Sequence, residues 1–230
     1  MTKYRLTGIT NEFGLYRIEA VVDGPWGPAG TKGGWVASEA NLSQDGSCWV
    51  GGNAWVYDRA TVVGNAVVTG SAHIADKAKV GGNAHVWGKA HVWGEAQIYD
   101  DAQVYGSARV YGIAQIYNNA HVLGEAWVGG EAFVFGSAQV DGTARIAGGA
   151  SITGSARIHT STDYLCIGPL GPYEMPLTVY RTPTGLEAST GALTAPLAEI
   201  LPLIEAQFAG YPGAGEHYRR ALAYAQEHFQ

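Results

Sequence analysis

Histidines recur at a regular spacing in the middle of the chain and could act as general bases. His73 and His91 are 18 residues apart, and His85 and His121 stand at equivalent positions of the same pattern. Imidazole titrates near neutral pH, so it can accept a proton during group transfer. On neighbouring strands, His73 and His91 would lie about 4.8 Å apart. Because no Cys, Asp or Glu stands at the equivalent positions beside this pair, and Arg109 follows it, the sequence predicts no metal site.

Aromatic side chains recur in the same region and at the same 18-residue spacing. Rings of Trp and Tyr bind planar ligands by stacking, and a nearby Arg or His can bind a phosphate or carboxylate. A monomer rarely exposes so much aromatic surface, so this belt also predicts self-association. The residues predicted to form an interface or a ligand site are Trp87, Trp93, Tyr99, Tyr105, Tyr111, Tyr117, Trp127, His73, His91 and Arg109.

These residues belong to a six-residue repeat that runs without interruption from Val50 to Arg157. Its eighteen hexapeptides have Val or Ile at position one, Gly, Asp or Asn at position three, and Ala at position five. Val and Ile favour extended backbone and would point inward, whereas Gly, Asp and Asn tolerate the positive φ of a sharp corner. Such a period indicates a solenoid in which each hexapeptide forms one side. Positions six and two, which carry the histidines and most of the rings, would face outward.

Three hexapeptides per turn would close six turns, and an imperfect turn precedes them. Residues 36–41 fit the pattern, but the unit from Leu42 to Trp49 has two extra residues. The sequence therefore predicts an all-β fold, a parallel β-helix of about seven turns over residues 36–158. The open ends of a solenoid expose strand edges that need to be covered. We predict an N-terminal β cap over residues 1–35 and a small C-terminal α+β cap over residues 159–230.

The two caps have their own strand and helix signals. Strand-like residues occupy 3–7 and 14–22 in the N-terminal cap. In the C-terminal cap, Thr194 would begin a helix that runs from Ala195 to about Phe208, with Pro196 in its first turn and Pro202 kinking it. Further predicted elements are strands over 164–167, 177–181 and 186–189, and a second helix over roughly 216–229.

Composition narrows the class of protein. A net charge of −6 and a pI near 5.6 argue against a dedicated nucleic-acid binder and against binding to an anionic membrane. The two cysteines, Cys48 and Cys166, flank the repeat at opposite ends, so reduced thiols are expected. The N-terminus has no apolar leader and no stretch is long enough to span a membrane. These features predict a cytoplasmic protein.

The hexapeptides resemble the left-handed β-helix of hexapeptide-repeat proteins, whose best-known members are trimeric acyltransferases. The stretch from Gly33 to Ser43, followed by Cys48-Trp49-Val50, is similar to the opening of hexapeptide-repeat proteins encoded by bacteria, phages and prophages. The segment Ile167-Gly168-Pro169 is similar to tails in that group. The resemblance covers nearly the whole chain and implies a left-handed fold in a bacterial host. It carries no catalytic residues across, because the solenoid is a scaffold.

Two functions follow as hypotheses. The first is a non-enzymatic binding or assembly protein, a phage or prophage accessory factor that forms a homotrimer. It would use its aromatic surface for self-association and for capture of a nucleotide-like ligand or a host protein, without a cofactor. The second is a hexapeptide-repeat acyltransferase that uses acetyl-CoA, with His85 or His91 as the nominal general base. Hexapeptide acyltransferases usually build their pocket from a loop extruded from the solenoid, and the eighteen hexapeptides contain none.

Overall fold

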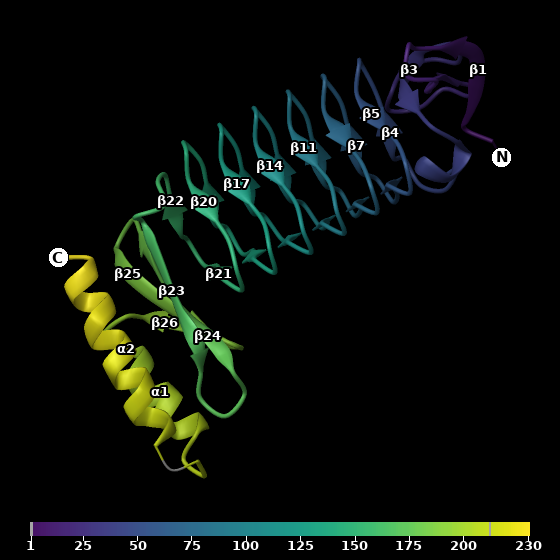
Figure 1. The fold of residues 1–230 in the computed structure, drawn as a ribbon. Coiled ribbons are helices and arrows are strands. Elements are labelled where there is room, and N and C mark those ends of the chain that lie inside the picture. Colours follow the sequence, from purple (N-terminus) through teal and green to yellow (C-terminus); the bar gives the residue numbers. More distant parts are fainter. Residues whose placement is uncertain (1, 212) are drawn as a thin grey trace.

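The chain folds into a long parallel β-solenoid with antiparallel strands at both ends (Figure 1). The computed structural model describes residues 2–211 and 213–230. Two-residue strands recur every six residues, and each pairs in parallel with the strand 18 residues further along. This arrangement confirms the predicted parallel β-helix of about seven turns in a mostly β chain, with two short helices near the C-terminus.

The solenoid has three faces, and each face is one sheet. The first face, with strand order β1-β2-β3-β5-β8-β11-β14-β17-β20, begins with antiparallel strands and becomes parallel where β3 meets β5. Its strands are β1 (Tyr4–Thr10), β2 (Tyr16–Ala20), β3 (Lys32–Val36), β5 (Trp55–Val56), β8 (His73–Ile74), β11 (His91–Val92), β14 (Arg109–Val110), β17 (Trp127–Val128) and β20 (Arg145–Ile146).

The other two faces are wholly parallel. The second face consists of β4 (Trp49–Val50), β7 (Val67–Val68), β10 (His85–Val86), β13 (Gln103–Val104), β16 (His121–Val122), β19 (Gln139–Val140) and β22 (Arg157–Ile158). The third face consists of β6 (Thr61–Val62), β9 (Lys79–Val80), β12 (Gln97–Ile98), β15 (Gln115–Ile116), β18 (Phe133–Val134) and β21 (Ser151–Ile152).

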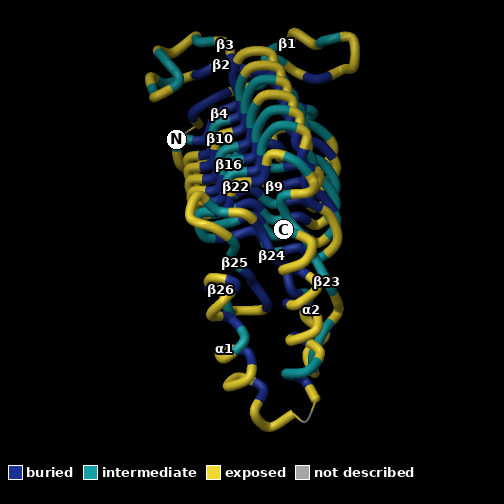
Figure 2. Tube along the Cα trace, turned by 90° about the vertical axis from the view of Figure 1, so that its left-hand side faces the viewer, coloured by how far each residue is buried: buried dark blue, intermediate teal, exposed yellow. Residues whose placement is uncertain are grey.

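The interior of the solenoid is a continuous apolar column. In Figure 2, buried residues recur along the successive turns of the coil. The Val and Ile side chains at position one and the Ala side chains at position five are at most 1% exposed from Val50 to Ile158. Stacked aliphatic side chains from successive turns therefore form the core, as the repeat predicts. The residues left to contact solvent or a partner are those on the outer surface.

The corners have the backbone geometry that the sequence predicts. Every residue at position three has a positive φ, including the non-glycine residues Asp58, Asp76, Asp100 and Asn118 at 53°, 58°, 56° and 54°. These four side chains also bond along the corner. For example, Oδ2 of Asp76 accepts a hydrogen bond from the N–H of Gly94, one turn later, at 2.9 Å. Such bonds offset part of the cost of the left-handed conformation.

The first turn is irregular and is held by the N-terminal segment. A 3₁₀ helix, η1 (Glu39–Asn41), and the two extra residues interrupt it, yet Leu42 still bridges to Val62 in parallel. Lys3 is only 5% exposed, and its Nζ lies 3.1 Å from Sγ of the buried Cys48 and 3.2 Å from the carbonyl oxygen of Asp45. The extra residues thus supply carbonyl groups that satisfy a buried ammonium at this end.

The C-terminal segment forms a four-stranded antiparallel sheet with two helices on the side away from the solenoid (Figure 1). One side of the sheet packs on the last turn through Tyr180, and the other side packs on the helices through Leu177 and Val179. The elements are β23 (Tyr164–Leu170), β24 (Met175–Thr182), β25 (Gly185–Thr190), β26 (Leu193–Pro196), α1 (Ile200–Gln207) and α2 (Ala214–His228).

The prediction of a helix that begins at Ala195 is wrong. Residues 193–196 form β26, which pairs antiparallel with β25, and α1 begins only at Ile200. Sheet pairing therefore outweighs the capping signal at Thr194. Pro202 falls in the first turn of this shorter helix, where its missing N–H needs no partner, so it does not interrupt the helix. β3 is a further strand that was not predicted from the sequence.

Candidate functional site

The first face carries a column of aromatic, imidazole and guanidinium groups at position six. The ring centroids of Trp55 and His73 lie 4.5 Å apart, and those of His73 and His91 lie 4.9 Å apart. Further along, the guanidinium of Arg109 lies 4.5 Å from the ring centroid of Trp127, and that of Arg145 lies 5.1 Å from the same ring. Because Arg109 and Arg145 come from the turns before and after, Trp127 stacks between two cations.

The two histidines of this column are held in the neutral form. Burial lowers the pKa of His73, and the neighbouring His91 lowers it further. Burial also lowers the pKa of His91, and the positive charge of Arg109 acts in the same direction. A neutral imidazole can accept a proton, but the ring of His73 is stacked on Trp55 and lies against His91 with a tilt of 32°. The column therefore presents flat surfaces and two guanidinium groups, a combination suited to binding planar or anionic partners.

The histidines do not form a catalytic site with carboxylates. Within residues 2–211 and 213–230, no carboxylate hydrogen-bonds to the imidazole of His73, His85, His91 or His121. His85 is exposed, and its ring lies edge-on to Trp87, with centroids 6.4 Å apart. A general base normally needs a group that orients it and a pocket for the acceptor. In the described part of the chain, no group of three or more His, Cys, Asp and Glu residues could hold a metal ion.

The aromatic residues form stacked pairs on all three faces. The centroids of Trp87 and Tyr105 lie 4.2 Å apart on the second face, with an angle of 3° between the ring planes. The pair Trp93 and Tyr111 on the first face and the pair Tyr99 and Tyr117 on the third face are each 5.1 Å apart. All six rings are only partly buried. Phe135, which was not among the predicted site residues, extends the third stack at 4.8 Å from Tyr117.

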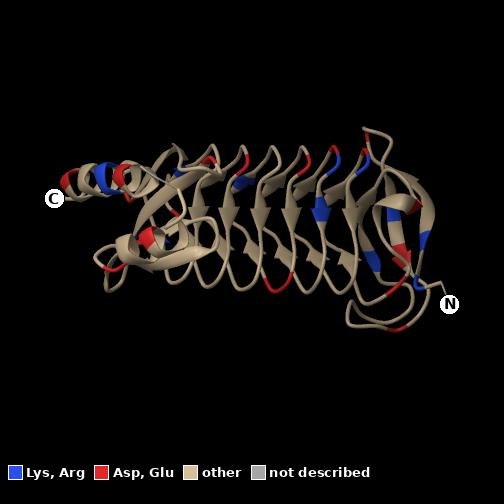
Figure 3. Cartoon of the chain, turned by 90° about the horizontal axis from the view of Figure 1, so that it is seen from below, with Lys and Arg blue, Asp and Glu red and all other residues tan. Residues whose placement is uncertain are grey.

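The structure does not bring all ten predicted site residues into one pocket. His73, His91, Arg109, Trp127, Trp93 and Tyr111 share the first face, whereas Trp87 and Tyr105 lie on the second and Tyr99 and Tyr117 on the third. Most charged residues of the solenoid lie on the loops between strands, as Figure 3 shows, and Lys77 and Glu95 pair there at 2.6 Å. The outward strand residues of the faces from Trp49 to Arg157 are uncharged apart from Lys79, Arg109, Arg145 and Arg157.

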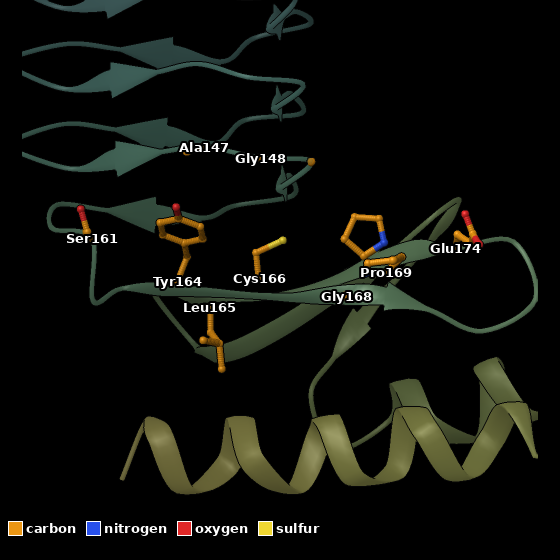
Figure 4. Close-up of a pocket in the computed structure, with 11 residues that line it drawn as sticks. Ala147, Gly148, Ser161, Tyr164, Leu165, Cys166, Gly168, Pro169 and Glu174 are labelled. Carbon is orange, nitrogen blue, oxygen red and sulfur yellow. The ribbon is translucent and has the colours of Figure 1, made fainter.

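A cavity of about 610 Å³ lies between the last turn of the solenoid and the C-terminal sheet (Figure 4). The side chains of Tyr164 and Cys166 point toward the solenoid, whereas Leu165 points toward the helices. The hydroxyl of Tyr164 donates a hydrogen bond to the carbonyl oxygen of Arg145 at 2.9 Å. Burial raises the pKa of the Cys166 thiol, so the thiol is protonated at neutral pH and is a weak nucleophile. This cavity was not predicted from the sequence.

One carboxylate–imidazole pair was also not predicted from the sequence. Nδ1 of His159 lies 2.5 Å from Oδ1 of Asp141, and Gln139 donates a hydrogen bond to the other carboxylate oxygen at 2.6 Å. The 18-residue separation of Asp141 and His159 could have revealed the pair, because it continues position two of the repeat by one turn. The imidazole is 75% exposed, and neither residue lines the cavity of Figure 4. We therefore assign this pair a structural role at the end of the second face.

Comparison with known families supports the repeat architecture. Residues 96–112 and 114–130 match a family model described as the YdcK beta solenoid repeat. The two matched segments are successive turns that carry Tyr99, Arg109, Tyr111, Tyr117 and Trp127. The fold and this match together define the chain as a β-solenoid repeat protein.

The search of curated proteins finds no match to this chain. No helix among the described residues is long and apolar enough to cross a membrane.

Proposed function

We propose that this chain is a non-enzymatic assembly and binding protein that forms a homotrimer through its outer faces. The stacked pair of Trp87 and Tyr105 on the second face carries this proposal. From Trp49 to Leu123, the outward positions six and two of that face contain no Asp, Glu, Lys or Arg. Interface cores are rich in aromatic residues and poor in Lys, Glu and Asp, and this face has that composition.

The flatness of the second face also favours contact with another copy. The ring planes of Trp87 and Tyr105 differ by 3°, and the parallel strands beneath them repeat in strict register. A flat and regular surface can pack closely against a similar solenoid, and closed symmetry limits the assembly to a fixed number of copies. The trimer and the left-handed winding that we propose rest on the resemblance to hexapeptide-repeat proteins. The positive φ at every corner residue, such as Asp100, is compatible with that repeat class.

We further propose that the protein acts in the cytoplasm of a bacterial host as a phage or prophage accessory factor. Faces that remain outside the trimer would capture a small nucleotide-like ligand or a host protein. The column on the first face supports this part of the proposal, because Arg109 and Arg145 stack on both sides of Trp127. Guanidinium groups held in this way can bind phosphate or carboxylate groups.

The mass in solution, measured by light scattering on a size-exclusion column, tests the assembly. We expect the wild-type chain at three times its own mass, and Tyr105→Glu as a monomer because the variant buries an unpaired charge at the contact. Lys89→Glu, which changes the charge of an exposed corner on the same turn as Trp87, should remain a trimer. A monomeric wild type, or a Tyr105→Glu variant that still forms trimers, would overturn the proposal.

The acyltransferase hypothesis is not favoured by any observed geometry, because His85 and His91 lack carboxylate partners among the described residues. Incubation with acetyl-CoA and a panel of amines and alcohols tests it directly. Turnover that disappears in His85→Ala or His91→Ala would replace our assignment.

A further inference from the structure

The aromatic stack on the third face has a gap at its N-terminal end. At position two of this face, Tyr99, Tyr117 and Phe135 stack one turn apart, with ring planes that differ by 2° and 1°. The same position is Gly81 one turn before Tyr99 and Val63 one turn before that. Tyr99 therefore has a ring against one of its faces and a residue without a side chain next to the other.

Gly81 is itself buried, but the space where its side chain would start is filled only in part. A Cβ built at Gly81 would have a single other atom within 4 Å, Cγ2 of Val63 at 3.2 Å, so the ring of Tyr99 does not fill the gap. Gly129 on the first face is different, because a Cβ there would lie 2.1 Å from the ring of Tyr111, which covers that glycine. A cavity of about 450 Å³ lies over the third face at this place, lined by Val63, Gly81 and Tyr99 together with residues of position six.

The width of the gap matches one planar ring. Neighbouring strands of a sheet are about 4.8 Å apart, so Val63 and Tyr99 are separated by two such steps, about 9.6 Å. The rings already in the stack lie 5.1 Å and 4.8 Å apart. A ligand ring at the level of Gly81 would continue this spacing, with Tyr99 on one face and the Val63 methyl groups on the other. Offset stacking at this separation is favourable.

The positive charge at the edge of the gap favours a ligand that carries an anionic group. Lys79 is exposed and is the charged residue among those that line the cavity, and Gln97 lies beside it in the next turn. The nearby carboxylate of Glu95 is paired with Lys77 at 2.6 Å. The ammonium of Lys79 is thus available to an anionic group, and the amide of Gln97 can donate a hydrogen bond to the same group.

We propose that the gap between Val63 and Tyr99 is a binding site for a planar aromatic anion. The ring of the ligand stacks on Tyr99 above Gly81, and its carboxylate or phosphate binds Lys79 and Gln97. The site goes beyond the self-association proposed above: it binds a ligand on the third face, whereas the stacked pair that carries the assembly proposal lies on the second.

Titration with bicyclic aromatic probes tests the site. The probes are 2-naphthoate, 2-naphthyl phosphate and the neutral 2-naphthamide, followed by probe fluorescence and by chemical-shift changes at Tyr99. We expect both anions to bind about tenfold more tightly than the amide, because the amide carbonyl can accept a hydrogen bond from Lys79 but has no negative charge to pair with its ammonium. The two anions distinguish a carboxylate site from a phosphate site. Failure of the wild-type protein to bind either anion would overturn the proposal.

Two variants locate the binding. Gly81→Tyr places the protein's own ring in the gap and should abolish binding, and it should fold because Gly81 has no positive φ and tyrosine occupies the equivalent positions 99 and 117. A thermal melt checks the fold. Lys79→Gln should weaken binding of the anions about tenfold and leave the amide unchanged, whereas the corner variant Lys89→Gln should change neither. Undiminished binding of naphthoate to a folded Gly81→Tyr protein would refute the site.

The same titration on the Tyr105→Glu variant separates this proposal from the assembly. We expect unchanged affinity whether that variant is a monomer or a trimer, since Tyr105 lies on a different face. Loss of binding in Tyr105→Glu with its fold intact would show that the gap alone is not the site.

Discussion

The imidazole rings of His73 and His91 lie one turn apart on the first face, with their centroids 4.9 Å from each other. Trp55 stacks on one side of this pair and Arg109 follows on the other. Protonation of both rings would place two positive charges side by side and next to a guanidinium. This contact therefore links the stability of the column to pH.

We expect the free energy of unfolding to fall as the pH is lowered through the ordinary histidine pKa of 6.5. Burial lowers the pKa of both residues in the folded chain, so the unfolded chain binds more protons in this range, and stability rises with pH. Urea unfolding at about pH 7.5 and about pH 5 measures the difference. The double variant His73→Gln/His91→Gln should show a smaller difference than wild type, and an unchanged difference would contradict the prediction.

Shortening an inward side chain should destabilise the solenoid strongly. Ile116 is fully buried, so Ile116→Val should cost about 0.5–1.5 kcal/mol and Ile116→Ala about 2–5 kcal/mol. The neighbouring residue on the same strand, Gln115, faces outward and accepts a hydrogen bond from the Tyr99 hydroxyl at 3.2 Å, so Gln115→Ala should cost about 0.5–1.5 kcal/mol, less than Ile116→Ala. Denaturant unfolding gives all three values. Equal losses in Gln115→Ala and Ile116→Ala would mean that the inward and outward assignments are wrong.

A side chain at a glycine corner should also be destabilising. Gly106 has a φ of 73°, and a Cβ there would lie 2.9 Å from the backbone nitrogen of Gly124 in the next turn. Gly106→Ala should therefore lower the free energy of unfolding by at least about 1–2 kcal/mol, the cost of the left-handed conformation alone. Ser107→Ala, at the adjacent exposed position, is the matched control and should be nearly neutral. A melting temperature that is the same for both variants would argue against strain at this corner.

The contact between Arg109 and Trp127 should contribute measurable coupling. A double-mutant cycle with Arg109→Gln and Trp127→Ala should give about 0.5–1 kcal/mol at this partly exposed site. The cycle is best measured in an Arg145→Gln background, because Arg145 contacts the same ring. A coupling free energy of zero in that background would mean that the contact between Arg109 and Trp127 does not stabilise the fold.

The repeat itself could be predicted in detail from the sequence because each of its positions has one physical role. On every strand an outward residue is followed by an inward Val or Ile, so Val104 points into the core. Asp100 takes a positive φ because the corner requires that conformation. The 18-residue period alone then places residues such as Trp87 and Tyr105 one above the other. What a period cannot predict is side-chain orientation. Tyr111 covers Gly129, whereas Tyr99 does not cover Gly81, although both tyrosines occupy position two.

The ends of the chain were harder to predict because contacts between distant residues determine their structure. Thr194 has the local signal of a helix start, but pairing with residues 187–190 makes the segment a strand. The pair of Asp141 and His159 forms just beyond the last complete hexapeptide, where the 18-residue separation was the one signal that could have revealed it. The cavity beside Cys166 depends on how the C-terminal sheet lies against the last turn, which no spacing in the sequence encodes.

In the last turn of the solenoid, two backbone N–H groups have no following turn to bind, and they donate hydrogen bonds to side chains from outside the repeat. Arg145 donates to Oγ of Ser161, and Ser151 donates to Oγ1 of Thr178, both at 3.0 Å. A bare final turn would offer an incoming molecule the same edge that each turn offers the next, and such edges can template growth into fibres. Because foreign hydroxyl groups already occupy these two donors, neither N–H is free to pair with a strand of another molecule.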